Sequence, residues 1–279
     1  MFTALHLNPE EINTIENRRK YTVSVIGCGQ RGILYAVAFA EAGFKVTCTD
    51  ADQSLVRRLA KGKTPFSERE VESKLKNFMR TGQLNATNEL KNAVSQSDIT
   101  IMTTTAKIDD KKNPDYSEAE SSCKQVGAAL HRGALVIYGG IAGFGFTEGV
   151  IKETLENTSG LRVGEDFGLA YNPLQIPDGQ PSESISNQEL KVAANDKTSL
   201  DAASTVLGTV TKKGVKKILG VKTAELAALF NVVRRDANVA LANELAILCE
   251  NASMDYFEMS KLLVPDTGET SFAPTIAEE

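Results

Sequence analysis

The stretch that decides the fold runs from Thr22 to Asp50 and reads TVSVIGCGQ-RGILYAVAFA-EAGFKVTCTD. It opens with a short, mostly apolar and β-branched run, which is typical of a buried parallel strand. Three glycines follow at the spacing G-x-G-x-x-G, and residues 33–42 then have the composition of an apolar helix. A second strand ends at Asp50. This order of strand, glycine turn, helix and strand predicts the first unit of a doubly wound sheet.

The glycine spacing has a chemical reading in which each position has its own task. Gly27 permits a tight turn, Gly29 lets the backbone approach a pyrophosphate, and Gly32 lets the helix lie close to the strand. The helix N-terminus would then direct its N–H groups at the phosphates, and Asp50 would hold the ribose hydroxyls. The predicted cofactor contacts are Gly27, Gly29, Gln30, Arg31, Gly32, Asp50, Thr104 and Thr105.

Two points about this site stay open at the level of sequence. Three glycines at this spacing also occur in an ordinary strand–turn–helix, although the flanking strand, helix and acid all favour a dinucleotide site. Asp50 favours NAD over NADP, because a carboxylate repels a 2′-phosphate. Arg31, Arg57 and Arg58 would weaken the preference for NAD if they faced the ribose. In the alternative interpretation they are solvated charges on their helices and do not affect this preference.

Composition narrows the class of protein. The 279 residues are 42% hydrophobic and 24% charged, with a formal net charge of −5, so no basic stripe for nucleic acid is expected. No apolar run has the length of a membrane span, and residues 1–20 do not resemble a secretory signal. The four cysteines are scattered without a CxxC pair, which predicts a reducing cytoplasmic setting and no metal site.

The rest of the chain alternates strands and helices until residue 219 and is helical afterwards. Predicted strands are 22–27, 45–50, 84–87, 98–104, 134–138, 167–171, 190–194 and 215–219; predicted helices are 8–20, 33–42, 54–61, 67–81, 89–95, 116–132, 147–157, 196–210, 223–251 and 255–263. The predicted domains are an N-terminal helical arm (1–20), a NAD-binding Rossmann-like domain (21–219), a central helical dimerisation region (220–263) and a polar tail (264–279).

This alternation predicts an α/β fold with a parallel, doubly wound sheet, followed by a long central helix. Ligands of such sheets bind at the carboxyl ends of the strands. The ends expected to share one cleft are Gly27–Gly32, Asp50, Thr103–Thr105, Gly139–Gly140 and Asn172–Pro173.

Four stretches together resemble the UDP-glucose/GDP-mannose dehydrogenase family: Val25–Asp50, Lys61–Pro65, Leu161–Pro173 and Arg235–Glu250. The resemblance implies a Rossmann domain, NAD as cofactor and a helical dimerisation core. It also implies the oxidation of a sugar alcohol to a carboxylate in two hydride transfers, through a cysteine thiohemiacetal and thioester.

The chain departs from the family at most of the residues to which the resemblance assigns that chemistry. Thr105 matches a threonine that helps to place a water. Leu174 stands at the position of a glutamate that does acid–base work, Ala228 at that of a lysine and Val232 at that of an asparagine, with Asn231 one residue away. Gly139–Ile141 replaces a Glu-Ser-Thr strand end. The family's cysteine loop and C-terminal nucleotide-sugar domain have no counterpart after Cys249.

Three hypotheses for function follow. The chain is an oxidoreductase acting on CH–OH groups with altered chemistry, on a nucleotide sugar or related metabolite; or a catalytically silent NAD-binding partner or regulator; or a fragment of a longer dehydrogenase. None of them predicts four-electron formation of a uronate. Weak candidates for proton transfer are Thr105, Lys107, Tyr171, Asp178 and Lys222.

The central helix also predicts assembly. Small and apolar residues recur along it at spacings of three, four and seven, which allows another helix to approach closely. They are Ala224, Ala227, Ala228, Val232, Val239, Ala242, Ala246 and Cys249. A two-fold homodimer through this stripe is expected, and the alternative is packing within one chain.

Overall fold

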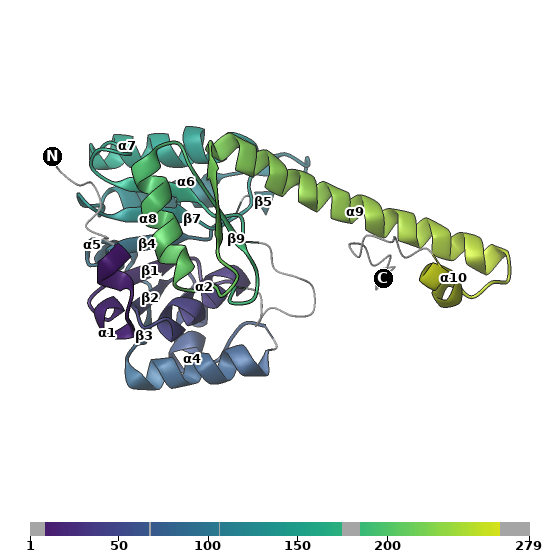
Figure 1. Ribbon diagram of the computed structural model, residues 1–279, viewed down its shortest axis with the longest axis horizontal. Coiled ribbons are helices and arrows are strands. Elements are labelled where there is room, and N and C mark those ends of the chain that lie inside the picture. Colours follow the sequence, from purple (N-terminus) through teal and green to yellow (C-terminus); the bar gives the residue numbers. More distant parts are fainter. Residues whose placement is uncertain (1–8, 67, 106, 175–184, 263–279) are drawn as a thin grey trace. The chain divides into compact units, whose positions relative to one another are not determined.

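The computed structural model describes residues 9–66, 68–105, 107–174 and 185–262. Its main sheet has eight strands in the order β10-β9-β8-β7-β4-β1-β2-β3 (Figure 1). These strands are β1 (Thr22–Ile26), β2 (Lys45–Thr49), β3 (Leu84–Thr87), β4 (Ile99–Met102), β7 (Leu135–Tyr138), β8 (Gly168–Tyr171), β9 (Leu190–Ala194) and β10 (Val215–Leu219). The order places β1 and β4 at the centre, with one βαβ half on each side. The predicted α/β fold is confirmed.

Most of the sheet is parallel, with one exception at its far edge. β9 pairs with β8 in the antiparallel sense, through Tyr171 and Ala193, and β10 then runs parallel to β9. The expectation of an entirely parallel sheet is therefore wrong for the last two strands. An apolar, β-branched run can pair in either direction, so the sequence of β9 does not fix which way the strand runs. Mixed sheets of this kind are common.

Helices cover both faces. The α-helices are α1 (Ile15–Arg18), α2 (Gln30–Glu41), α3 (Gln53–Ala60), α4 (Arg69–Thr81), α5 (Leu90–Ser95), α6 (Ser117–Gly127), α7 (Glu153–Ser159), α8 (Lys197–Gly208), α9 (Val221–Asn251) and α10 (Tyr256–Leu262). A 3₁₀ turn, η1 (Pro9–Ile12), and α1 replace the predicted helix 8–20, because the side chain of Thr14 caps a new helix start. A π-helical stretch, η2 (Thr147–Lys152), leads into α7.

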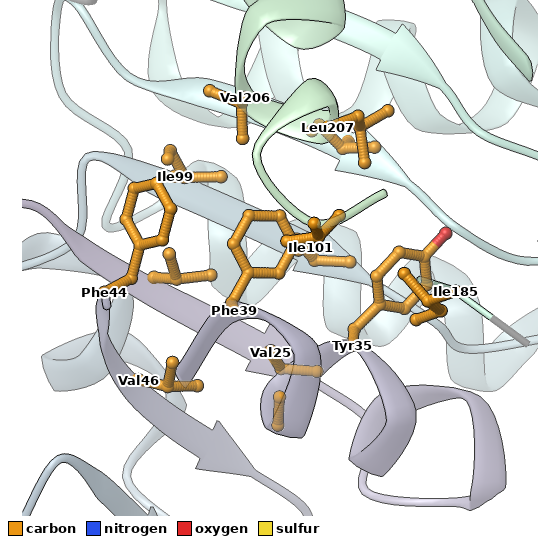
Figure 2. Close-up of a cluster of buried hydrophobic side chains, with 14 of the residues drawn as sticks. Val25, Tyr35, Phe39, Phe44, Val46, Ile99, Ile101, Ile185, Val206 and Leu207 are labelled. Atoms are coloured by element: carbon orange, nitrogen blue, oxygen red, sulfur yellow. The ribbon is translucent and has the colours of Figure 1, made fainter. Parts of the chain in front are cut away.

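The core lies in two layers, one on each face of the sheet. On one face, strand residues such as Val25 and Ile101 pack against Phe39 of α2 and Val206 of α8 (Figure 2). On the other face, Ile26 and Met102 pack with residues of α5, α6 and α7. Burial on both faces explains why the strands read as continuous apolar runs rather than alternating ones.

The remaining strands, β5 (Lys107–Ile108) and β6 (Pro114–Asp115), form a small antiparallel pair in a stretch predicted to be loop. The side chain of Asp109 holds this turn by accepting bonds from the N–H groups of Lys111 (2.9 Å) and Asn113 (2.7 Å). Because this Asx-type turn holds the two short strands together, they do not need longer strand pairing. The sequence therefore has no run of strand-forming residues here that would predict them.

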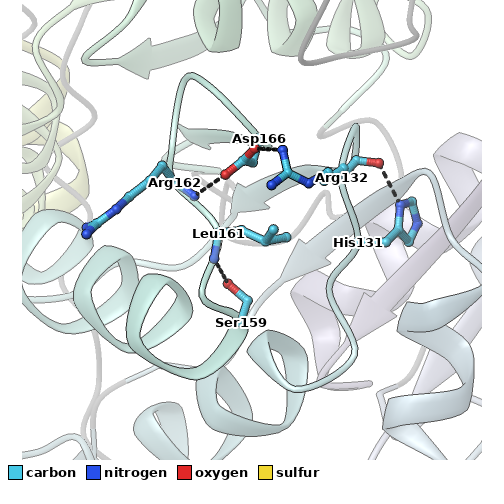
Figure 3. A network of polar contacts seen from close by, with 6 residues as sticks. All are labelled: His131, Arg132, Ser159, Leu161, Arg162 and Asp166. Carbon is cyan, nitrogen blue, oxygen red and sulfur yellow. Dashed lines mark hydrogen bonds and ion pairs between the residues drawn. The ribbon is translucent and has the colours of Figure 1, made fainter. Parts of the chain in front are cut away.

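Polar contacts join the two connections that lead into β7 and β8 (Figure 3). The Arg132 guanidinium pairs with Asp166, whose carboxylate also accepts the N–H of Arg162 at 2.9 Å. The hydroxyl of Ser159 accepts the N–H of Leu161 at 3.1 Å. These contacts hold the amino-terminal edge of the sheet, opposite the strand ends at which ligands of such folds bind.

By compactness the chain divides into two units, residues 1–226 and 227–279, with the division inside α9. The first unit contains the whole sheet. In the second, α9 continues to Asn251 and α10 follows, close to the predicted 223–251 and 255–263. Among the described helices, none has both the length and the apolar character needed to cross a membrane.

Candidate cofactor site

The glycine turn between β1 and α2 has the geometry predicted for it. Gly27 has a φ of +90°, a conformation that favours glycine, and its N–H donates to Thr49 O at 2.9 Å. A Cβ on Gly32 would lie 1.8 Å from Gly27 O, so only glycine lets α2 start this close to β1. Gly29 is different, because a Cβ there would meet nothing within 4 Å. The open space lies where a pyrophosphate would approach.

The N-terminus of α2 is available to an anion. Gly29 is its N-cap and, having no side chain, leaves the first N–H groups of the helix without a capping bond. Gln30 at the first helical position is exposed, and Arg31 beside it is half-buried. Uncapped N–H groups and the helix dipole favour a phosphate at this end.

Asp50 follows β2 directly and faces the glycine turn. One carboxylate oxygen accepts the N–H of Cys28 at 2.7 Å, and the other accepts the N–H of Asp52 at 2.9 Å. The carboxylate is half-buried and keeps acceptor capacity on both oxygens. Its position beside the turn is the one from which a ribose diol would be bound in a dinucleotide site.

Three threonines follow β4. Thr103 is a structural residue that sequence reasoning missed, because its hydroxyl is 3.1 Å from Ile26 O and 2.9 Å from Gly27 O and so supports the glycine turn. The predicted contacts Thr104 and Thr105 are both half-buried at the same edge. Among the described residues, the buried hydroxyl of Thr104 has no hydrogen-bond partner. Only the β4 register next to β1 identifies Thr103 as the supporting residue.

Tyrosines fill the space beside the ends of β7 and β8. A Cβ on Gly139 would lie 2.7 Å from the ring of Tyr35, and one on Gly140 would lie 2.5 Å from the hydroxyl of Tyr138. The Tyr35 hydroxyl bonds to the side chain of Asn172, whose amide donates to Lys191 O at 2.6 Å. The two glycines therefore make room for aromatic rings, which the sequence alone did not reveal.

The structure does not gather the described candidates for proton transfer into one site, and the two lysines among them are held in ion pairs. Lys107 pairs with Glu118 at 2.5 Å and Lys222 with Glu148 at 2.7 Å. In each lysine the partner carboxylate raises the pKa. Burial raises the pKa of Tyr171, so its phenol stays protonated at neutral pH. Asp178 lies outside the described residues.

Two of the positions at which the chain departs from the family are buried and apolar. Leu174 is 1% exposed and belongs to the core layer that contains α2. Ala228 is 3% exposed on α9. Neither side chain can carry a proton or a charge, so neither can replace the acid or base that the resemblance led us to expect there. No cluster of three or more metal-ligating side chains occurs in the described part of the chain.

Comparison with known proteins gives the same family as the motifs. The sequence model described as "UDP-glucose/GDP-mannose dehydrogenase family, NAD binding domain" matches residues 21–211. UDP-N-acetyl-D-mannosamine dehydrogenase of Pyrococcus horikoshii is 29% identical over 86% of this chain and 56% of its own. Protein CapL of Staphylococcus aureus is 30% identical over 86% and 55%, respectively. The chain thus spans little more than half the length of these relatives.

Solved structures agree at the level of the fold. UDP-N-acetyl-D-mannosamine dehydrogenase of P. horikoshii superposes with a TM-score of 0.82 and 25% identity, over 91% of this chain and 59% of that one. GDP-mannose dehydrogenase of Pseudomonas aeruginosa gives 0.80 at 22% identity, over 86% and 56%. The chain belongs to the UDP-glucose/GDP-mannose dehydrogenase family of oxidoreductases, and it carries that family's NAD-binding domain.

Proposed function

We propose that the chain binds NAD(H) with its pyrophosphate on the N-terminus of α2 and its adenosine ribose on Asp50. The observation that carries this proposal is the placement of Asp50, whose two oxygens accept the N–H groups of Cys28 and Asp52 and so aim the carboxylate at the glycine turn. The open space at Gly29 supports the same orientation. We assign the nicotinamide to the half of the sheet formed by β4, β7 and β8.

We further propose that any reaction is a single hydride transfer on a nucleotide sugar or related metabolite, and not the four-electron oxidation of a sugar to a uronate. The named relatives are dehydrogenases of UDP-N-acetyl-D-mannosamine and UDP-N-acetyl-D-glucosamine. Here the buried Leu174 and Ala228 leave two positions without proton-transfer or charge-stabilising capacity.

A second candidate function is a catalytically silent NAD-binding partner or regulator of an active enzyme. One observation favours it: the described lysine candidates, Lys107 and Lys222, are held in ion pairs. A hydride transfer to or from an alcohol needs a group that moves a proton, and neither lysine is free to do so.

Calorimetry with NADH and NADPH tests the cofactor assignment, since it predicts tighter binding of NADH. If neither dinucleotide binds the folded protein, the central proposal is wrong. Purified protein incubated with NAD and UDP-glucose, UDP-N-acetylmannosamine or GDP-mannose then tests the chemistry. One NADH per sugar would support altered chemistry, no NADH with tight cofactor binding would support the silent partner, and two NADH per sugar would contradict both.

Finally, we propose that the chain forms a homodimer through α9. We also propose a cytoplasmic location, which rests on the cysteine pattern alone. Large apolar residues are exposed along one side of α9: Leu226, Phe230, Val233, Leu241, Ile247 and Leu248. Leu226 and Leu248 lie equally far from Ala237, as do Val233 and Leu241. These two pairs share one midpoint, and such an arrangement suits an antiparallel contact with a second copy of the helix.

A further inference from the structure

Among the described residues, Arg31 is a cation without a partner at the carboxyl-terminal edge of the sheet. Its side chain is half-buried, and its Nε atom is shielded from solvent. It makes no hydrogen bond or ion pair with any described residue. A partly desolvated guanidinium normally has a carboxylate or phosphate beside it, because its fork of N–H donors matches those groups.

Two tyrosine hydroxyls that feel the charge of Arg31 also lack a partner in the part of the chain that the structure describes. Tyr138 and Tyr171 end the neighbouring strands β7 and β8, are paired in register, and stack with ring centroids 5.8 Å apart. Both residues are at most 1% exposed, and neither hydroxyl has a hydrogen-bond partner among the described residues. Buried hydroxyls in folded proteins are nearly always bonded, so a pair of unbonded ones on adjacent strand ends calls for a ligand or water.

The charges around these phenols keep them as donors. Burial is the largest influence and raises the pKa of both, the charge of Glu225 raises them as well, and the Arg31 guanidinium lowers them. Glu225 itself is engaged, since its oxygens accept the N–H groups of Gly145 and Thr147 at 2.8 Å each. The unpartnered groups are therefore a guanidinium and two neutral phenols, all able to donate hydrogen bonds.

We propose that Arg31, Tyr138 and Tyr171 bind a compact oxyanion, a carboxylate or phosphate group of a small molecule that lies beside the nicotinamide. The inference rests on the proposed function, because it uses the cofactor orientation given above. Arg31, the partly exposed member, also donates to the anion. The bound oxygens satisfy the three groups that lack partners, which supplies part of the binding energy.

The two tyrosines of this group are distinct from the site assigned to the cofactor's own pyrophosphate, whereas Arg31 is the second residue of α2 and directly follows that site. The pyrophosphate is assigned to the backbone at Gly29 and the N-terminus of α2, next to β1. Tyr138 and Tyr171 are on β7 and β8, which follow β1 and β4 in the sheet order. An oxyanion at the tyrosines thus occupies the half of the sheet on the substrate side of the cofactor.

The test is calorimetric titration of oxalate and of inorganic phosphate, with glycerol as the uncharged control, into the protein saturated with NADH. The two anions distinguish a carboxylate from a phosphate site. The wild type is expected to bind one of them and not glycerol. The double variant Tyr138→Phe with Tyr171→Phe is expected to bind it about tenfold more weakly or worse. Its thermal midpoint should not fall, because the hydroxyls removed have no partner.

Tyr35→Phe is the matched control. It also removes a buried hydroxyl, but one that is bonded to Asn172, so it should lower the thermal midpoint and leave anion affinity unchanged. Failure of both anions to bind the wild type, or equal affinity in the double variant, would overturn the proposal. If NADH does not bind, the proposed function fails, and the same anion titrations into the free protein decide this inference separately.

Discussion

At the scale of single residues, Gly32 and Gly29 are expected to separate folding from binding. Gly32→Ala should destabilise the protein by about 1–3 kcal/mol, because the new methyl group overlaps Gly27 O and α2 must move away from β1. Gly29→Val places its side chain in open space, so the protein should fold while NADH affinity falls by about tenfold or more. Thermal unfolding and calorimetry measure the two effects. A normal NADH affinity in Gly29→Val would contradict the pyrophosphate assignment.

Asp50 allows a second test at this scale. Asp50→Ala should lower the affinity for NADH by about tenfold or more, since charge-assisted hydrogen bonds to the ribose are lost. It should also reduce the difference in affinity between NADH and NADPH. Asp52→Ala is the matched control, because Asp52 accepts the N–H of Ser54 at 2.7 Å and caps α3 without facing the glycine turn. Equal losses of NADH affinity in the two variants would show that the effect is indirect.

At the scale of elements, α9 has two apolar faces. The structure shows that the exposed face, and not the predicted stripe of small residues, is the one to mutate in a test of dimer formation. Within the predicted stripe of small residues, Ala224, Ala228, Ala242 and Cys249 are buried in the chain itself. A charge at Ala242, which is 0% exposed, would disturb folding before it could report on a partner. The opposite face, with Val233 and Leu241 about half exposed, is the surface to change.

We therefore expect Val233→Glu combined with Leu241→Glu to convert a dimer into a monomer. The two positions flank the midpoint of the exposed face, so a two-fold contact would bring their charges together in a desolvated interface. Light scattering at micromolar concentration measures the mass, with the exposed Glu250→Lys as a charge-change control. A monomeric wild type, or a dimer that survives the double change, would exclude this contact.

At the scale of the whole molecule, the division into two compact units predicts an uneven response to cofactor. The proposed cofactor site lies in residues 1–226, so NADH should stabilise that unit and not residues 227–279. NADH at about 100 times its Kd adds about 2.7 kcal/mol to a binding-competent unit, which raises its midpoint by about 5–11 °C. Differential scanning calorimetry measures this shift, and the shift should vanish in Gly29→Val. A comparable shift in that variant would place binding elsewhere.

The sequence predicted the elements better than their directions. Every predicted strand from 22–27 to 215–219 is present, because apolar, β-branched runs between helices have few alternatives. The direction of β9 was wrong, since an apolar run pairs equally well either way and direction is decided by how the connection crosses the sheet. The turn at 107–115 was read as loop for a similar reason: Asp109 holds it through side-chain bonds, which leave no periodic pattern.

By itself the sequence determined the α/β class, the glycine turn and the acid at Asp50, because these depend on local spacing along a single βαβ unit. Only the tertiary structure decided what surrounds the other strand ends. Thr103, at the end of a neighbouring strand, donates to Gly27 O. The rings of Tyr35 and Tyr138 occupy the space that side chains on Gly139 and Gly140 would need. Arg31, Tyr138 and Tyr171, which lack partners among the described residues, come from α2, β7 and β8. Contacts between residues so far apart in sequence arise from packing, and no local pattern encodes them.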